Sequence, residues 1–210
     1  MTDAKSERYL RGNGVELVRE REVARRVQRA LSRLYALEGD DDVRDFIEPA
    51  GAGERETLLV RQSEEGGLEI ALRLAPLTDA LDGFCQLIEG VSHFVYVAHR
   101  AEVERETTQL ELEIQAEVDK YVVLAHGVSG LSAASSERLR RRLYEGVSYV
   151  HDEGTHEGER YRVANGAAHR FTERIERKYV GTSRVLAMRE ELRAFFEMGL
   201  EEKLRAARGS

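Results

Sequence analysis

Four residues in the last third of the chain have side chains that could do acid–base chemistry. Residues 158–179 fit one helix, and Tyr161, Asn165, His169 and Glu173 then lie on one row of that helix. A histidine oriented by a glutamate can transfer protons, and an asparagine amide can stabilise an oxyanion. The same row is typical of a solvated helix face with a stabilising His–Glu pair, and we favour that interpretation.

The segment before this helix, HDEGTHEG, offers nitrogen and oxygen atoms that could ligate a divalent metal. The candidate ligands are His151, Asp152, His156 and Glu157. Their spacing does not match the HExxH pattern of zinc proteases, because Arg160 stands where the second histidine should be, and it lacks the alternating acids of an EF-hand. We therefore expect a linker whose acids favour the next helix start, with a divalent metal as the alternative and no other cofactor.

Arginines repeat every four residues on the first predicted helix. Arg21, Arg25, Arg29 and Arg33 would lie on one row, where like charges one turn apart repel by roughly 0.2–0.5 kcal/mol each. The row therefore predicts anionic neighbours. Pairing with acids of this chain, or simple solvation, is our first interpretation, an acidic protein partner is the second, and the phosphates of a nucleic acid are the third.

Composition and motifs argue against several classes of function. The 210 residues carry a formal net charge of −7, which disfavours general affinity for nucleic acids. The sequence contains neither a GxGxxG motif nor a phosphate-loop motif, and GVSGL at 127–131 lacks the final glycine of a serine-hydrolase elbow. The single cysteine, Cys85, excludes a disulfide framework and a thiolate metal cluster.

Hydropathy and cysteine usage predict a cytoplasmic protein with no membrane association. No stretch approaches the ~20 uncharged apolar residues that span a bilayer, and the N-terminus lacks the apolar segment of a secretory signal. A lone cysteine agrees with a reducing compartment. The partners that we expect are another protein or a second copy of the chain, and not a nucleic acid.

The apolar periodicity predicts an α+β fold that is predominantly helical. Residues 57–62 and 68–75 are typical of an antiparallel hairpin, since apolar side chains occupy every second position of the second strand. A short helix that Gly90 ends is followed by residues 92–99, which indicate a third strand. The hairpin and this strand would form a small mixed sheet in the N-terminal half, with a parallel crossover through the helix.

The rest of the sequence is typical of helices. The first has an apolar stripe from Val23 to Leu37 and is followed by a short helical turn that acids at 40–42 begin. A helix capped by Thr108 is apolar on nearly all sides, which predicts a central position and basic partners for Glu113 and Glu117 if they are covered. Three further helices are predicted, at residues 135–150, 158–180 and 183–208.

We expect one compact domain over residues 1–210, with the first helix and the sheet extending to about residue 100 and a helical part from about residue 105. Because catalytic motifs are lacking, the leading hypothesis is a non-catalytic binding or regulatory module. It would act through helix faces, such as the arginine row or the apolar face around Phe195 and Phe196. The alternative is a hydrolase-type enzyme that uses the row on 158–179, with or without a metal, and nucleic-acid binding is third.

Overall fold

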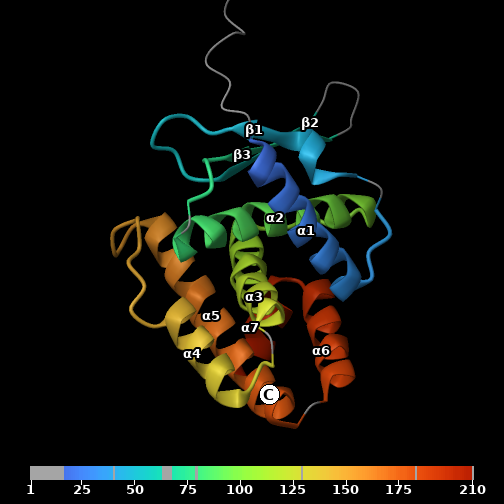
Figure 1. The fold of residues 1–210 in the computed structure, drawn as a ribbon, viewed down its shortest axis with the longest axis vertical. Coiled ribbons are helices and arrows are strands. Elements are labelled where there is room, and N and C mark those ends of the chain that lie inside the picture. The colour runs from blue at the N-terminus through green and yellow to red at the C-terminus, as the bar shows by residue number, and fades with distance from the viewer. Residues whose placement is uncertain are drawn as a thin grey trace, which may run out of the picture.

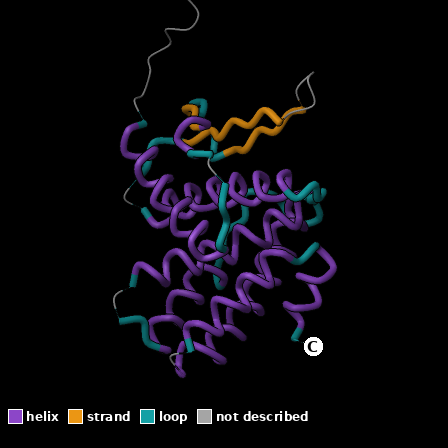
Figure 2. Tube along the Cα trace, turned by 90° about the vertical axis from the view of Figure 1, so that its right-hand side faces the viewer, coloured by secondary structure: helices purple, strands orange, loops and turns teal. Residues whose placement is uncertain are grey.

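Helices form most of the structure, and a small sheet lies at one end (Figures 1 and 2). The computed structural model describes residues 17–39, 41–62, 68–78, 80–128, 130–182 and 184–209. In these residues, seven α-helices and a three-stranded mixed sheet form the predominantly helical α+β fold that the sequence predicts. Within the same residues, every helix is too short or too polar to span a lipid bilayer.

Most helices and strands begin close to the residues predicted from the sequence. The α-helices are α1 (Val18–Tyr35), α2 (Leu81–Glu102), α3 (Gln109–Gly127), α4 (Ala133–Tyr144), α5 (His156–Tyr179), α6 (Val185–Glu197) and α7 (Leu200–Arg208). Two short 3₁₀ helices lie in the described residues, η2 (Val43–Phe46) and η3 (Val180–Thr182). The strands are β1 (Ile47–Pro49), β2 (Thr57–Gln62) and β3 (Leu68–Leu74).

The sheet contains the predicted hairpin, but its third strand comes from another segment. β2 and β3 pair antiparallel, which confirms the hairpin. β1 pairs parallel with β3, so the strand order is β1-β3-β2. Pro49 lies in the edge strand β1, where the missing backbone N–H of proline is tolerated.

The predicted strand at residues 92–99 is wrong, and so is the crossover that depended on it. These residues lie in the second half of α2, which continues through Gly90. Every residue from 87 to 97 except His93 is buried. A helix that is covered on all sides has the same uninterrupted apolar run as a buried strand, and this run misled the prediction.

Gly90 lies where α2 packs against the sheet. A Cβ atom at this position would lie 2.8 Å from Cδ1 of Leu72 and 3.5 Å from Cδ2 of Leu74, both on β3. A glycine inside a helix costs about 1 kcal/mol relative to alanine. Here the glycine permits the close approach of helix and sheet, and it does not end the helix.

The helix α3 has the central position that its all-round apolar pattern predicts. It contacts α1, α2, α4, α5 and α7. Its first turn is capped as expected, because Oγ1 of Thr108 accepts a hydrogen bond from the backbone N–H of Glu111 at 3.2 Å. The side chains of α3 therefore face neighbours on several sides, and its polar residues are buried among them.

Two of the predicted C-terminal helices have different bounds in the structure. α4 ends at Tyr144 and does not continue to residue 150. The predicted helix at 183–208 is divided into α6 and α7. At the division, Nζ of Lys203 donates a hydrogen bond to the carbonyl of Phe195 at 2.6 Å, which satisfies a carbonyl in the last turn of α6.

The apolar face of α6 packs into the interior of the chain. Leu192, Phe195 and Phe196 are buried, and the ring of Phe196 stacks on Tyr35 of α1 with 4.1 Å between centroids. This part of the predicted apolar face is therefore occupied by the chain's own core. It does not form an exposed docking surface.

Candidate functional site

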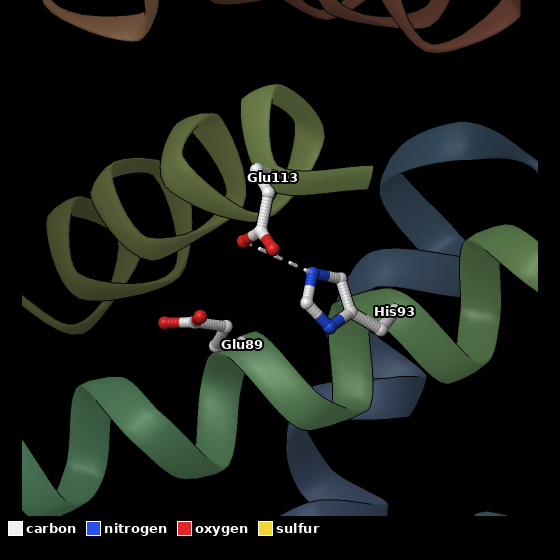
Figure 3. A group of neighbouring side chains, drawn as sticks. All are labelled: Glu89, His93 and Glu113. Atoms are coloured by element: carbon white, nitrogen blue, oxygen red, sulfur yellow. Dashed lines mark ion pairs between the residues drawn. The ribbon is translucent and has the colours of Figure 1, made fainter. Parts of the chain in front are cut away.

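Helices α2 and α3 bring three metal-ligating side chains together. Glu89 and His93 are one turn apart on α2, and Glu113 reaches them from α3 (Figure 3). One ligand atom from each of the three lies within 4.8 Å of the others. Within the described part of the chain, no other three histidine, cysteine or acidic side chains converge in this way.

The His93 ring presents an unbonded nitrogen to this group. Its Nε2 atom is buried, has no hydrogen-bond partner and lies 3.8 Å from Oε2 of Glu113, which is too far for a hydrogen bond. Burial lowers the pKa of His93, and a neutral imidazole with one free nitrogen is the form that ligates metals.

Glu113 is 7% exposed, and its nearest cation stays beyond hydrogen-bonding distance. Nε of Arg160, on α5, lies 3.6 Å from Oε1 of Glu113 and is itself a buried atom with no hydrogen-bond partner. Burial and the negative charge of Glu89 raise the pKa of the Glu113 carboxyl to about 8. This carboxyl therefore lies beside a second carboxylate, and its basic partner Arg160 does not come within hydrogen-bonding distance.

Lys120 of α3 holds two carboxylates at once. Its Nζ atom donates hydrogen bonds to Oε2 of Glu89 at 3.0 Å and to Oε1 of Glu117 at 2.7 Å. Burial by itself would lower the pKa of Lys120, but the two carboxylates raise it well above its ordinary value. Lys120 is therefore a buried ammonium between two glutamates.

A cavity of about 550 Å³ opens beside these side chains. Glu89, Glu117 and Lys120 form part of its wall, and Tyr161 and Asn165 line it from α5. The start of β2, the end of α4 and the loop before α5 supply further lining residues. The group of metal-ligating residues thus shares Glu89 with a cavity that is large enough for a small molecule.

Glu56 also lines this cavity, from the residue that precedes β2. Its Oε2 atom is buried and has no hydrogen-bond partner. Its Cγ atom lies 3.5 Å from the position that a Cβ of Gly90 would take, which places Glu56 against α2 next to Glu89. Burial and the charge of Glu89 raise the pKa of Glu56 to about 8.

Together these residues form a cluster with an excess of acidic side chains. We call the following residues the acidic cluster: Glu56, Glu89, His93, Glu113, Glu117, Lys120 and Arg160. Lys120 and Arg160 supply the predicted basic partners of Glu117 and Glu113. The cluster's four carboxyls thus outnumber its two cationic side chains, and Arg55 on the cavity wall also acts on Glu56 and Glu89. Burial, and then the charge of Glu89, raises the pKa values of Glu56 and Glu113.

The predicted row on α5 divides between two places. Tyr161 and Asn165 line the cavity, whereas His169 and Glu173 lie outside its lining. Nε2 of His169 lies 2.6 Å from Nη1 of Arg140, whose guanidinium can only donate, so this ring nitrogen accepts the hydrogen bond. Burial and the charge of Arg140 lower the pKa of His169. The four residues therefore do not converge on one pocket.

The histidine-rich segment before α5 is exposed and does not gather its ligands. The four predicted metal ligands are all exposed: His151, Asp152, His156 and Glu157. α5 begins at His156, after Thr155 has capped the helix by accepting a hydrogen bond from the N–H of Gly158 at 3.0 Å. The ring of His151 stacks on Tyr161 with 5.6 Å between centroids and lines the cavity. The segment is the helix start that the sequence predicts.

The arginine row on α1 is paired at one end and exposed at the other. Arg21 donates a hydrogen bond of 2.6 Å to a backbone carbonyl of β1, and Nε of Arg25 lies 3.5 Å from Oδ2 of Asp42. Arg29 and Arg33 are exposed. With Arg25 they line a shallow hollow that shares no residue with the cavity beside the acidic cluster. The row and the histidines of 151–169 therefore do not meet in a common cleft.

Sequence reasoning missed the residues that form the centre of the site. The strand predicted at residues 92–99 places Glu89 and His93 in different elements. A usable signal was present, since Glu89 and His93, like Glu113 and Glu117, are spaced four residues apart. That spacing aligns each pair on one helix face.

No protein-family model, curated protein or solved structure matches the chain. The geometry and chemistry of its own residues are therefore the basis for assigning a function.

Proposed function

We propose that the protein is a divalent-metal-dependent enzyme of the hydrolytic type, in which Glu89, His93 and Glu113 hold the cation beside the cavity. One observation carries the proposal: Nε2 of His93 is buried without a hydrogen bond although it faces carboxylates. Buried polar atoms are nearly always hydrogen-bonded, so each exception calls for a physical reason. Metal ligation would supply the bond that this nitrogen lacks.

The chemistry of the three ligands supports a catalytic rather than a structural cation. One imidazole and two carboxylates suit Zn²⁺, Mn²⁺ or Fe²⁺, and three protein ligands leave coordination positions for water and substrate. Glu89 belongs both to this group and to the cavity wall. A small molecule in the cavity would therefore lie next to the cation.

The charge of the acidic cluster also supports a divalent cation. Its four carboxyls outnumber Lys120 and Arg160, and burial raises the pKa of Glu56 and of Glu113 to about 8. A divalent ion would balance their charge and so favour their ionised forms. Burial of unbalanced charge is expensive, so a neutralising ion would stabilise the folded chain as well as serve the chemistry.

Residues around the cavity could complete a hydrolytic site. A divalent cation lowers the pKa of a bound water and polarises a carbonyl or phosphoryl oxygen. Glu56, with a buried and unbonded carboxyl oxygen, could exchange a proton with the substrate or with water. Tyr161 and Asn165 offer polar groups that could orient the substrate.

Metal uptake and metal-dependent hydrolysis test this proposal together. Chelator-treated protein is reconstituted with Zn²⁺ or Mn²⁺, its metal content is measured, and it is assayed on carboxylic esters, amides and phosphate esters. We expect one metal equivalent and metal-dependent turnover in the wild type. His93→Ala and Glu113→Gln should bind metal at least about tenfold more weakly and lose turnover. His99→Ala is the matched control, because His99 lies on the same helix but pairs with Glu197 at 3.0 Å, outside the cluster.

Two results would contradict the proposal, and each contradicts a different part of it. Absence of metal uptake by the wild type, or equal affinity in His93→Ala, would contradict the cation site. A metal-loaded protein that hydrolyses none of the three substrate classes would contradict the hydrolytic assignment and leave the cation site standing.

A second function is favoured by the exposed end of the arginine row. Arg29 and Arg33 are exposed, and among the described residues no acidic side chain forms an ion pair with either. We propose that this surface binds an acidic protein or a second copy of the chain. The proposal keeps the binding role that the sequence favours and is independent of the metal site.

A further inference from the structure

Lys120 lies where a buried carboxylate, that of Glu89, and a half-buried one, that of Glu117, point at one position. Its ammonium is 3.0 Å from Oε2 of Glu89 and 2.7 Å from Oε1 of Glu117, and the residue is 9% exposed. Glu89 also belongs to the group of metal-ligating residues with His93 and Glu113. One carboxylate is thus shared between a fixed ammonium and the proposed cation.

We infer that Lys120 takes the place of a second metal ion and restricts the site to a single cation. The inference rests on the proposed function, because it concerns how many ions the same cluster holds. In two-metal hydrolytic sites the ions lie about 3.5–4 Å apart and act together on the reacting oxygens. Here Glu89 has the position of a bridging carboxylate, with the ammonium on one side and the ligand group on the other.

The surroundings of Lys120 contain the ligands that a second ion would need. Glu89 and Glu117 already direct oxygens at the ammonium. Glu56 lines the same cavity with an unbonded carboxyl oxygen, and its charge interacts with Lys120. If the ammonium were removed, two or three carboxylates would face one position without a cation, and a hard divalent ion prefers such oxygen ligands.

A fixed ammonium would also give the site a permanent positive charge. Unlike a metal ion, it cannot dissociate or be removed by a chelator. Next to a single cation, it could stabilise negative charge that develops on a substrate in the cavity, because Lys120 lines that cavity. Lys120 is therefore a residue that determines how many metal ions the cluster accepts.

Metal stoichiometry in Lys120 variants tests the inference. The protein is refolded in excess Mn²⁺ or Zn²⁺, freed of unbound metal, and analysed for metal content by mass spectrometry. We expect one equivalent in the wild type and in Lys120→Arg, which keeps the cation. Lys120→Met removes the charge at similar length and should bind two equivalents. The double variant Lys120→Met/Glu117→Gln removes a ligand of the second ion and should return to one.

A stoichiometry of one in folded Lys120→Met, or of two in the wild type, would overturn the inference. Failure of the proposed function is distinguishable, because the wild type would then bind no metal at all. If Lys120→Met does not fold, Lys120→Gln replaces it, with the same expectation of two equivalents. Glu117→Gln alone should leave the single equivalent of the wild type unchanged, and loss of that equivalent would also count against the inference.

Discussion

Among the buried polar clusters that involve α3, two differ in how completely their atoms are hydrogen-bonded. In the first, which we call the Asp119 network, Asp119 accepts hydrogen bonds from Ser92 at 2.6 Å, from Gln115 at 3.0 Å and from the hydroxyl of Tyr35. Lys203 donates to Gln115 at 2.7 Å. None of these five side chains has a buried nitrogen or oxygen without a partner.

The acidic cluster, in contrast, has buried atoms that remain unbonded and an adjacent cavity. Oε2 of Glu56, Nε2 of His93 and Nε of Arg160 all lack hydrogen-bond partners. Both clusters bury charge, so burial of charge does not by itself identify a functional site. Unbonded buried atoms beside a cavity do separate the two regions. We therefore propose a stabilising role for the Asp119 network and a functional role for the acidic cluster.

Removal of Asp119 should have the largest effect on stability. Asp119→Ala would leave the donors on Tyr35, Ser92 and Gln115 without their common acceptor. We expect the free energy of unfolding to fall by about 3 kcal/mol or more. Urea denaturation measures this change, and Asp82→Ala, at an exposed acid of α2, is the control with an expected change of about 0.5 kcal/mol or less. A loss below about 1 kcal/mol for Asp119→Ala would contradict the stability role.

Lys203 gives the Asp119 network a pH dependence. Burial lowers the pKa of Lys203 to about 7, against an ordinary value of 10.5. The charged groups that act on it are Asp119 and Glu111 of α3, Arg100 of α2 and Glu197 of α6. Between pH 7 and 10.5 the unfolded chain therefore binds more protons at this residue than the folded chain. The contribution of Lys203 to the unfolding free energy should rise with pH in that window, by at most about 1.4 kcal/mol per unit.

Denaturation at pH 7, 8 and 9 measures this rise as a difference between variants. The stability of the wild type relative to Lys203→Met should increase with pH. Lys178→Met, at a half-exposed lysine on α5, should show no comparable trend relative to the wild type. A difference between the wild type and Lys203→Met that is constant from pH 7 to 9 would contradict a lowered pKa in the folded chain.

In the acidic cluster, a conservative change should cost little stability. Glu113→Gln keeps the shape of the side chain and makes permanent the uncharged state that burial and the charge of Glu89 favour. We expect the metal-free variant to be as stable as the wild type or more stable, within about 1 kcal/mol, in the same urea denaturation. A loss as large as that of Asp119→Ala would mean that both clusters hold the fold, and the contrast between them would not stand.

The exposed arginines of α1 lie outside both clusters and should affect stability least. The double variant Arg29→Glu/Arg33→Glu should unfold within about 0.5 kcal/mol of the wild type. If this surface binds an acidic partner or a second copy, the variant should lose co-purifying protein or change its mass in light scattering. Association that is insensitive to the double change would contradict the proposed surface.

Local patterns predicted the fold where alternating hydropathy or a capping residue marks the element. The hairpin of β2 and β3 was found because its second strand alternates in hydropathy. α3 was found because Thr108 marks its start and its residue types favour helix. α2 was partly lost, because burial on all sides removes the periodicity that separates a helix from a strand. The glycine that permits its packing on β3 had the appearance of a helix end.

The candidate site was predicted less completely than the fold, for a physical reason. Tyr161 and Asn165 were singled out by helix spacing and do line the cavity. Glu89 and His93 were missed because their half of α2 was read as a strand. Beyond this error, whether a buried atom such as Nε2 of His93 has a hydrogen-bond partner depends on tertiary packing. That property cannot be read from the local sequence.

The binding of a metal by His93 is the central claim, and nitrogen NMR of the histidines tests it most directly. The chain has six histidines, and ¹⁵N labelling of their rings allows each resonance to be followed as one equivalent of Zn²⁺ is added. We predict a large shift of one Nε2 resonance, which is absent from the spectrum of His93→Ala. No shift, or a shift that belongs to His151 or His156, would contradict the site at Glu89, His93 and Glu113.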